Sequence, residues 1–120
     1  MLKYLCLLVA VAEVSPAHAA LDAKGRQEVD VLLKRVEQSG CIFVRNDDPH
    51  PAKEAADHLR LKLAKAGDKL RTADDFIDYL ATKSSWTGKP YTLRCAGRPD
   101  VQAGQWLKAE LKQYRTGRAN

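Results

Sequence analysis

Cys41-Ile42-Phe43-Val44-Arg45-Asn46 is the part of the sequence from which the architecture can be worked out. It is rich in β-branched and aromatic residues, which strands favour, while helical patterns lie on both sides of it. A second run of the same kind, Tyr91-Thr92-Leu93-Arg94-Cys95, ends with a cysteine where the first run begins with one. We therefore expect the segments 41–45 and 91–95 to pair as a short two-stranded ribbon.

The N-terminus has the pattern of an export signal. A short basic start is followed by the unbroken apolar run Leu5–Ala12 and by an A-x-A cleavage site that ends at Ala19. The alternative is a membrane anchor, but a span needs about 20 apolar residues, and Glu13 interrupts this run. We expect residues 1–19 to be removed, which leaves one small globular domain at 20–120, in the periplasm or secreted, without a transmembrane anchor.

Two cysteines remain after that cleavage, Cys41 and Cys95, and an isolated pair in an exported protein predicts one disulfide. The alternatives are a reactive thiol or a metal site that would also need His50 and His58, whose spacing from Cys41 matches no recognised zinc pattern. An antiparallel ribbon with the cysteines opposite each other keeps apolar and aromatic groups on one face. A parallel ribbon would leave the cysteines about 13 Å apart, too far for a bridge. The expected pairs are Cys41 with Cys95, Phe43 with Leu93 and Arg45 with Tyr91.

The charge balance is basic. The chain has 20 Lys and Arg against 15 Asp and Glu, a formal net charge of +5. The basic residues are dispersed, which is typical of a solvated surface, and a basic exported protein meets anionic envelope polymers before nucleic acid. We therefore expect no nucleic-acid partner, and the sequence contains no motif for a cofactor or a metal.

Apolar residues at helical spacing predict four helices, at about 21–39, 51–66, from Ala73 onward, and 101–115. Ser39-Gly40 and Gly67 should end the first two, and Pro51 suits the first position of the second. Thr72 and Asp75 should form a capping box, and Asp100 should cap the last helix. The expected fold is mainly α (α+β), with four helices around the two-stranded ribbon.

Three further segments carry expectations. Asn46–Pro51 is rich in turn-forming residues and is predicted to be a loop, as is Ser84–Pro90. Leu61 lies off the apolar stripe of the second helix, so either it is exposed or that helix is covered on two faces. We favour the second reading, a central helix. The tail Thr116–Asn120 should be loose.

Four blocks of sequence are Phe43–Asn46, Ala55 with His58–Leu63, Thr72–Ile77 and Ser84–Tyr91. Together they resemble the YfeK (DUF5329) family of small exported bacterial proteins of unknown function. Many relatives have glycine after the Arg-Asn pair, where this chain has Asp47, so a tight Asn-Gly turn is not expected. The resemblance implies an envelope protein and assigns no catalytic role.

Polar and basic groups should collect at the end of the ribbon opposite the disulfide. His58 and Lys62 are four residues apart on a helix, so they share a face. Such a cluster offers charge-assisted donors to an anionic or sugar-like ligand, although each member also has an ordinary structural interpretation. The candidate ligand-binding residues are Arg45, Asn46, His58, Lys62, Ser84, Ser85 and Tyr91.

Two functions follow from this cluster. The first is a non-catalytic envelope binding or interaction module for an anionic, sugar-like or protein ligand, such as a wall fragment or an envelope protein. The second is a small envelope hydrolase that uses His58 with Ser84 or Ser85. The hydrolase is the weaker hypothesis, because a serine hydrolase also needs an orienting third group and an oxyanion hole, and no G-x-S-x-G motif is present.

Overall fold

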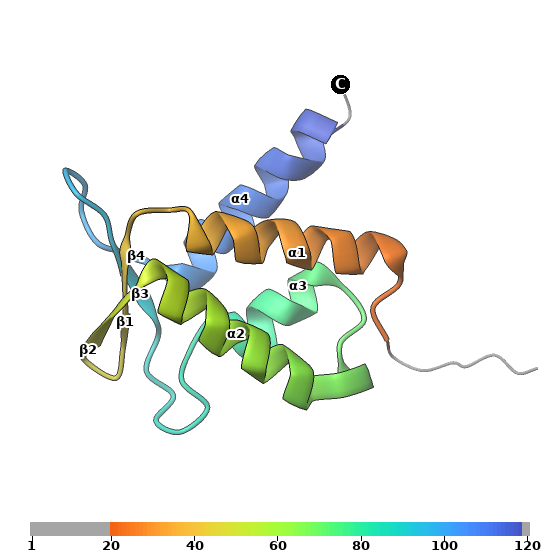
Figure 1. Ribbon diagram of the computed structural model, residues 1–120, viewed down its shortest axis with the longest axis horizontal. Coiled ribbons are helices and arrows are strands. Elements are labelled where there is room, and N and C mark those ends of the chain that lie inside the picture. Colours follow the sequence, from red (N-terminus) through yellow and green to blue (C-terminus); the bar gives the residue numbers. More distant parts are fainter. Residues whose placement is uncertain (1–19, 119–120) are drawn as a thin grey trace, which may run out of the picture.

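The computed structural model describes residues 20–118, so the expected signal peptide lies outside the described part of the chain. Within that part, four α-helices and a small antiparallel sheet surround one apolar core, which confirms the mainly α (α+β) prediction (Figure 1). The elements are, in order, α1 (Ala23–Glu37), β1 (Ile42–Arg45), β2 (Asp48–Pro51), α2 (Ala52–Ala66), the 3-10 turn η1 (Gly67–Lys69), α3 (Ala73–Phe76), the π-helical segment η2 (Ile77–Ala81), β3 (Thr92–Arg94), β4 (Val101–Gln102) and α4 (Ala103–Arg118).

The sheet lies at one end of the helices, with α1 and α2 side by side and α4 crossing behind them (Figure 1). Its strand order is β2-β1-β3-β4, and every neighbouring pair is antiparallel. Phe43 pairs with Leu93, and a disulfide joins Cys41 to Cys95 with a Cα–Cα distance of 4.5 Å. The predicted bridge and register are therefore confirmed, but the sheet has four strands where two were expected.

The strand β2 replaces the loop predicted for Asn46–Pro51. Asn46 and Asp47 have φ of 52° and 69°, so both adopt the left-handed conformation of a two-residue hairpin turn without any glycine. Asn and Asp tolerate that conformation better than most residues. Pro49 and Pro51 are two residues apart and so point the same way, and β2 is an edge strand, where a missing N–H removes no ladder hydrogen bond. The turn is therefore tight although Asp47 stands where an Asn-Gly turn would have glycine.

The last helix also begins and ends later than predicted. Val101 and Gln102 pair with β3, so α4 starts at Ala103. Asp100 does not cap it but lies 3.5 Å from the guanidinium of Arg94. The helix continues to Arg118, through the segment from Thr116 that was expected to be loose.

The second helix is covered on one face only. Ala56 and Leu59 are buried, whereas the side chain of Leu61 is 55% exposed, so the expectation of a central α2 was wrong. Pro51 precedes the helix as its N-cap, and Gly67 ends it with a positive φ of 59°.

Capping and the apolar core hold the remaining helices. Asp22 caps α1 by accepting a 2.7 Å hydrogen bond from the N–H of Gly25, and Thr72 and Asp75 form the predicted capping box of α3. Every helix and both inner strands contribute to the core. Its largest fully buried side chains are Val29, Leu32, Val36, Leu70, Phe76, Ile77, Leu93, Leu107 and Leu111.

Candidate functional site

The end of β1, the outer part of α2 and the loop between η2 and β3 enclose a hollow of about 690 Å³. All seven residues predicted from the sequence line it, so the structure brings the whole candidate set together. The complete lining is Arg45, Asn46, His58, Lys62, Lys65, Ala66, Lys69, Leu80, Ser84, Ser85, Trp86 and Tyr91. We call this space the basic hollow.

Arg45 and His58 form one wall of the basic hollow. Arg45 is the last residue of β1, and its Nη1 lies 3.4 Å from Nε2 of His58 on α2. Burial lowers the pKa of His58 below its ordinary value, and the positive charges of Arg45 and Lys62 lower it further. The imidazole is therefore neutral at pH 7, and its Nε2 can accept a hydrogen bond from Arg45.

Lys62 lines the hollow one helical turn after His58 and is half-buried. Its Nζ donates to the carbonyl oxygen of Leu80 at 2.7 Å and to the hydroxyl of Tyr91 at 3.0 Å. The same ammonium group lies 5.2 Å from the centroid of the Tyr91 ring. Because these partners are neutral, Lys62 is fixed in position while its charge remains available to a ligand.

Asn46 and Ser84 connect the hairpin turn to the loop 84–90. The Asn46 amide donates to Oγ of Ser84 at 3.2 Å, and the hydroxyl of Thr87 donates to its Oδ1. The same Ser84 oxygen accepts from the backbone N–H groups of Trp86 and Thr87. Ser84 is buried and shapes the turn, whereas Ser85 is exposed.

The contacts of Ser84 and His58 bear on the hydrolase hypothesis. Within the described residues, the hydrogen-bond partner of the His58 ring is Arg45, and those of the Ser84 hydroxyl belong to Asn46 and its own loop. Among the described residues, His58 is therefore hydrogen-bonded neither to Ser84 nor to Ser85, a contact that a serine–histidine dyad makes.

Five residues that line the hollow were not predicted from the sequence: Lys65, Ala66, Lys69, Leu80 and Trp86. Lys65 and Lys69 continue the series begun by His58 and Lys62 at helical spacing, with offsets of 4, 7 and 11 residues from His58. That periodicity was visible in the sequence. Trp86 is 92% exposed at the tip of its loop, and no sequence pattern placed it beside α2.

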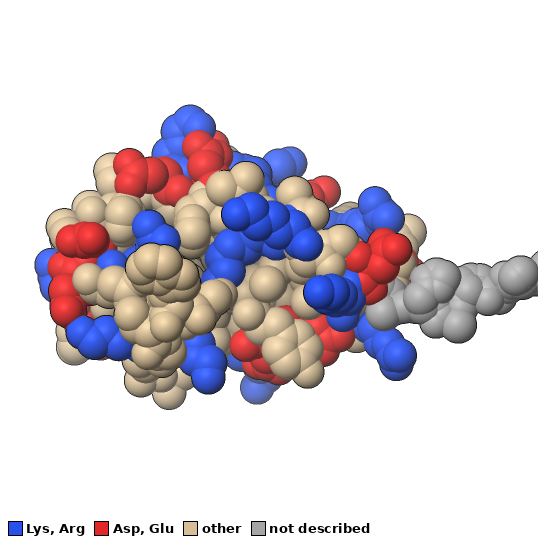
Figure 2. Space-filling model, turned by 90° about the horizontal axis from the view of Figure 1, so that it is seen from below, with Lys and Arg blue, Asp and Glu red and all other residues tan. Residues whose placement is uncertain are grey.

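The charged side chains that line the hollow are all basic. Arg45, Lys62, Lys65 and Lys69 contribute four cations, and no Asp or Glu lines the hollow. None of these four forms an ion pair within residues 20–118, whereas Arg35, Lys53, Arg60, Lys89, Arg94, Lys108 and Arg115 do. Figure 2, seen from below Figure 1, shows basic side chains among uncharged residues near the middle of this face, with further basic and acidic side chains around them.

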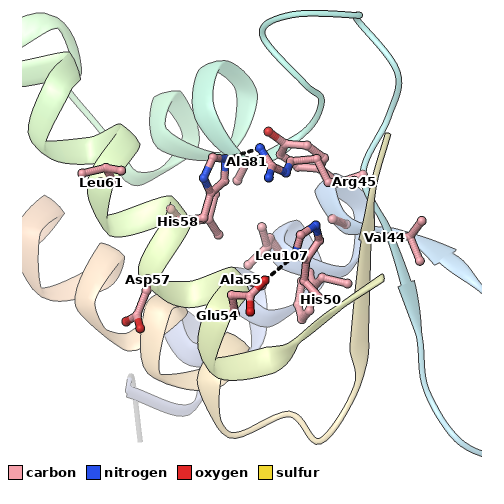
Figure 3. Close-up of a pocket in the computed structure, with 14 residues that line it drawn as sticks. Val44, Arg45, His50, Glu54, Ala55, Asp57, His58, Leu61, Ala81 and Leu107 are labelled. Atoms are coloured by element: carbon pink, nitrogen blue, oxygen red, sulfur yellow. Dashed lines mark hydrogen bonds and ion pairs between the residues drawn. The ribbon is translucent and has the colours of Figure 1, made fainter. Parts of the chain in front are cut away.

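A smaller apolar cavity of about 310 Å³ adjoins the basic hollow (Figure 3). It lies between α2, the β-hairpin and the start of α4, and its walls include Phe43, Leu59 and Leu107. Arg45, His58 and Tyr91 line both spaces. We call this second space the apolar cavity.

Residues 20–118 contain neither a cluster of metal-ligating side chains nor a helix that could span a membrane. No group of three or more His, Cys, Asp or Glu side chains there could hold a metal ion. None of the helices in that part of the chain is long and apolar enough to cross a membrane.

Comparison with known proteins identifies the family. The family described as "Family of unknown function (DUF5329)" matches residues 23–115. The chain belongs to this family. It is 41% identical over 92 residues to the uncharacterized protein YfeK of Salmonella typhimurium strain LT2, an alignment that covers 76% of this chain and 77% of that protein. No solved structure matches.

The matched region contains every residue that lines the basic hollow. The family's function is unknown, so membership confirms the resemblance seen in the sequence and assigns no role to any of these residues. The chemistry of the site therefore has to be argued from its geometry.

Proposed function

We propose that this protein is an exported, non-catalytic binding protein whose basic hollow holds an anionic ligand of the cell envelope. The observation that carries the proposal is the lining of the hollow, where four cations and a partly buried imidazole face one space that no carboxylate lines. Elsewhere on the domain, many basic side chains are neutralised by acidic neighbours. Uncompensated positive charge around a concave surface attracts anions and strengthens their hydrogen bonds.

The geometry suits a carboxylate, sulfate or phosphate group bound beside Arg45 and Lys62. Lys62 is already positioned by Leu80 and Tyr91, so little side-chain entropy is lost when its charge meets an anion. Arg45 is held in place by His58. The exposed indole of Trp86 offers a flat apolar face to the rest of a ligand, such as a sugar ring.

Inorganic sulfate is a suitable first probe because its charge is constant between pH 5 and 8. We expect sulfate to shift the backbone amide resonances of residues around the hollow in a saturable titration of the purified protein. Losing one charge-assisted contact costs roughly 1.5–3 kcal/mol, so Arg45→Ala and Lys65→Ala should each weaken binding by about tenfold or more.

Lys112→Ala is the matched control, because Lys112 is exposed on α4 and lies outside the hollow. It should bind sulfate as the unchanged protein does. Equal affinity in Arg45→Ala, Lys65→Ala and Lys112→Ala would show that the hollow is not the anion site.

Export is part of the proposal and rests on the N-terminal pattern of the sequence. When the full chain is expressed in a Gram-negative bacterium, we expect the periplasmic fraction to contain a protein that begins at Ala20, as measured by intact mass. A chain that retains Met1 and stays in the cytoplasm would contradict export without affecting the anion site.

A further inference from the structure

The apolar cavity shares a wall with the basic hollow. Arg45 and His58 line both spaces, and Figure 3 shows the two side chains joined between α2 and β1, with Ala81 beside them. Tyr91 also belongs to both linings: its hydroxyl accepts from Lys62 on the side of the basic hollow. A ligand held by Arg45 therefore lies at the entrance to the apolar cavity.

The buried part of that cavity's lining is apolar, and the exposed side chains of Glu54 and Asp57 line it as well. Phe43, Leu59, Ala81, Ala103 and Leu107 are all buried residues of the core, at most 6% exposed. Leu61, the residue that departs from the apolar stripe of α2, is a further lining residue and is 55% exposed. The volume of about 310 Å³ is at the lower end of the range for small-molecule sites, roughly 300–1,000 Å³.

One polar atom of this lining has no partner. His50 lies on the inner side of the hairpin, where its Nδ1 contacts Glu54, but its Nε2 is buried and has no hydrogen-bond partner within residues 20–118. Buried polar atoms are normally satisfied by protein or by a bound molecule. A polar group on a ligand in the cavity could satisfy this nitrogen.

From this arrangement we infer that the ligand is an anionic amphiphile, whose charged head lies in the basic hollow and whose short apolar chain enters the apolar cavity past Arg45 and His58. The inference rests on the proposed function, and it adds the chemical class of the ligand. An anion alone would leave the apolar cavity unused, and an uncharged apolar molecule would leave the four cations without a counter-charge.

Inorganic sulfate and octyl sulfate share a head group and differ in the chain, so they separate the two contributions. Each buried methylene contributes about 0.8 kcal/mol, or roughly fourfold in affinity. With three or four methylenes buried, octyl sulfate should bind about 100-fold more tightly than sulfate, measured by calorimetry below its micelle concentration. Octanol should bind at least tenfold more weakly than octyl sulfate, because it lacks the charge.

Ala55→Leu tests whether the octyl chain of the ligand binds in the apolar cavity. Ala55 lines the apolar cavity from α2, and a larger side chain there should remove most of the advantage of octyl sulfate while leaving the affinity for sulfate unchanged. Ala64→Leu is the matched control, because Ala64 is exposed on the same helix and lines neither space. In the unchanged protein, nuclear Overhauser contacts between octyl protons and Leu107 test the same point if Ala55→Leu does not fold.

The outcomes distinguish the inference from the proposed function. Equal binding of sulfate and octyl sulfate would overturn the inference and leave the anion site in place. A second contrary result is that octyl sulfate binds more tightly than sulfate while Ala55→Leu leaves that advantage unchanged and no contact to Leu107 is seen. The octyl chain would then bind elsewhere, and the inference would also be overturned. If neither compound binds, both the inference and the proposed function are wrong.

Discussion

His58 is placed where its protonation depends on the charge in the basic hollow. Burial and the charges of Arg45 and Lys62 lower its pKa below the ordinary value of about 6.5. Bound sulfate should raise that pKa, because a negative charge favours the imidazolium ion. Arg45→Ala should raise it as well, since it removes a positive charge. A titration followed by NMR at the imidazole protons measures both, and a pKa at or above 6.5 in the ligand-free protein would contradict the proposed electrostatics.

The same shift predicts how stability depends on pH. Between the lowered pKa of folded His58 and about 6.5, the unfolded chain binds more protons than the folded chain, so the contribution of His58 to stability falls as the pH is lowered through this window. Above the window it is constant. His58→Gln should remove this part of the decline, measured as the difference between the urea-unfolding free energies of the two proteins at pH 7.5 and pH 5.

Asp47 is the second of the two residues in the hairpin turn that have a positive φ. Its φ is 69°, and its carboxylate forms an exposed ion pair with Lys89 at 2.8 Å. Glycine has no penalty at this φ, while an exposed ion pair contributes only about 0–1 kcal/mol. We therefore expect Asp47→Gly to stabilise the fold by up to about 1 kcal/mol and Asp47→Ala to destabilise it by about 1 kcal/mol in chemical denaturation.

Lys89→Gln is the control for the ion pair, because it removes that pair and leaves the turn unchanged. It should change stability by less than either Asp47 variant. If Asp47→Gly were as destabilising as Asp47→Ala, the ion pair and not the backbone conformation would be the larger effect.

The contact between α4 and the residue after η2 is close-packed. A Cβ atom added to Gly104 would lie 2.9 Å from Oγ1 of Thr82, whose hydroxyl donates to the carbonyl oxygen of Ile77 at 2.7 Å and supports the π-helical segment. Thr82 would have to move and weaken that bond. Gly104→Ala should therefore destabilise the protein by about 1–3 kcal/mol, although alanine is the better helix former.

Gly117→Ala is the matched control on the same helix, since an added Cβ there meets nothing within 4 Å. It should be neutral or stabilise by up to about 1 kcal/mol. The two variants are compared by their urea midpoints at an unchanged m-value. Equal midpoints would show that α4 can move away from Thr82 without cost.

Local signals explain which elements were predictable. The helices could be predicted because their apolar stripes and caps, such as Thr72 with Asp75, are formed by residues that are close together in the sequence. β2 could not, because Pro49 and Pro51 argue against a strand unless it is known to be at the edge of a sheet. β4 consists of Val101 and Gln102 alone, and these two residues form a strand by pairing with the edge of β3. The π-helical segment Ile77–Ala81 likewise makes tertiary contacts, among them the hydrogen bond from Lys62 to the carbonyl oxygen of Leu80.

The central residues of the candidate site could be predicted from the sequence, whereas Trp86 and the adjoining apolar cavity could not. The antiparallel register follows from the two cysteines, and it brings Arg45 and Tyr91 to the same end of the ribbon, with α2 beginning a short hairpin away. The position of Trp86 depends on how loop 84–90 is tied back by Asn46 and Ser84, a contact between segments 38 residues apart. The apolar cavity could not be predicted, because it is defined by where Ala55, Ala81 and Leu107 leave space.

The disulfide links two inner strands of the sheet, since it ties the residue before β1 to the residue after β3. Its cysteines are 54 residues apart, so in the chain-entropy model it stabilises the folded state by roughly 4 kcal/mol. A domain of about 100 residues has roughly 5–15 kcal/mol in total. We therefore expect the Cys41→Ser, Cys95→Ser double variant to unfold at a much lower urea concentration.

The disulfide also provides a test that separates local from global effects. Because Cys41 and Cys95 lie at the end of the ribbon opposite Arg45, a reduced protein that is still folded should keep its affinity for sulfate. Thiol labelling of the oxidised protein under native conditions should find no reactive cysteine among residues 20–118. If two thiols were labelled in the oxidised protein, the bridge would be absent. If the reduced, folded protein lost sulfate binding, the basic hollow would depend on the bridge as well as on the hairpin turn and on α2.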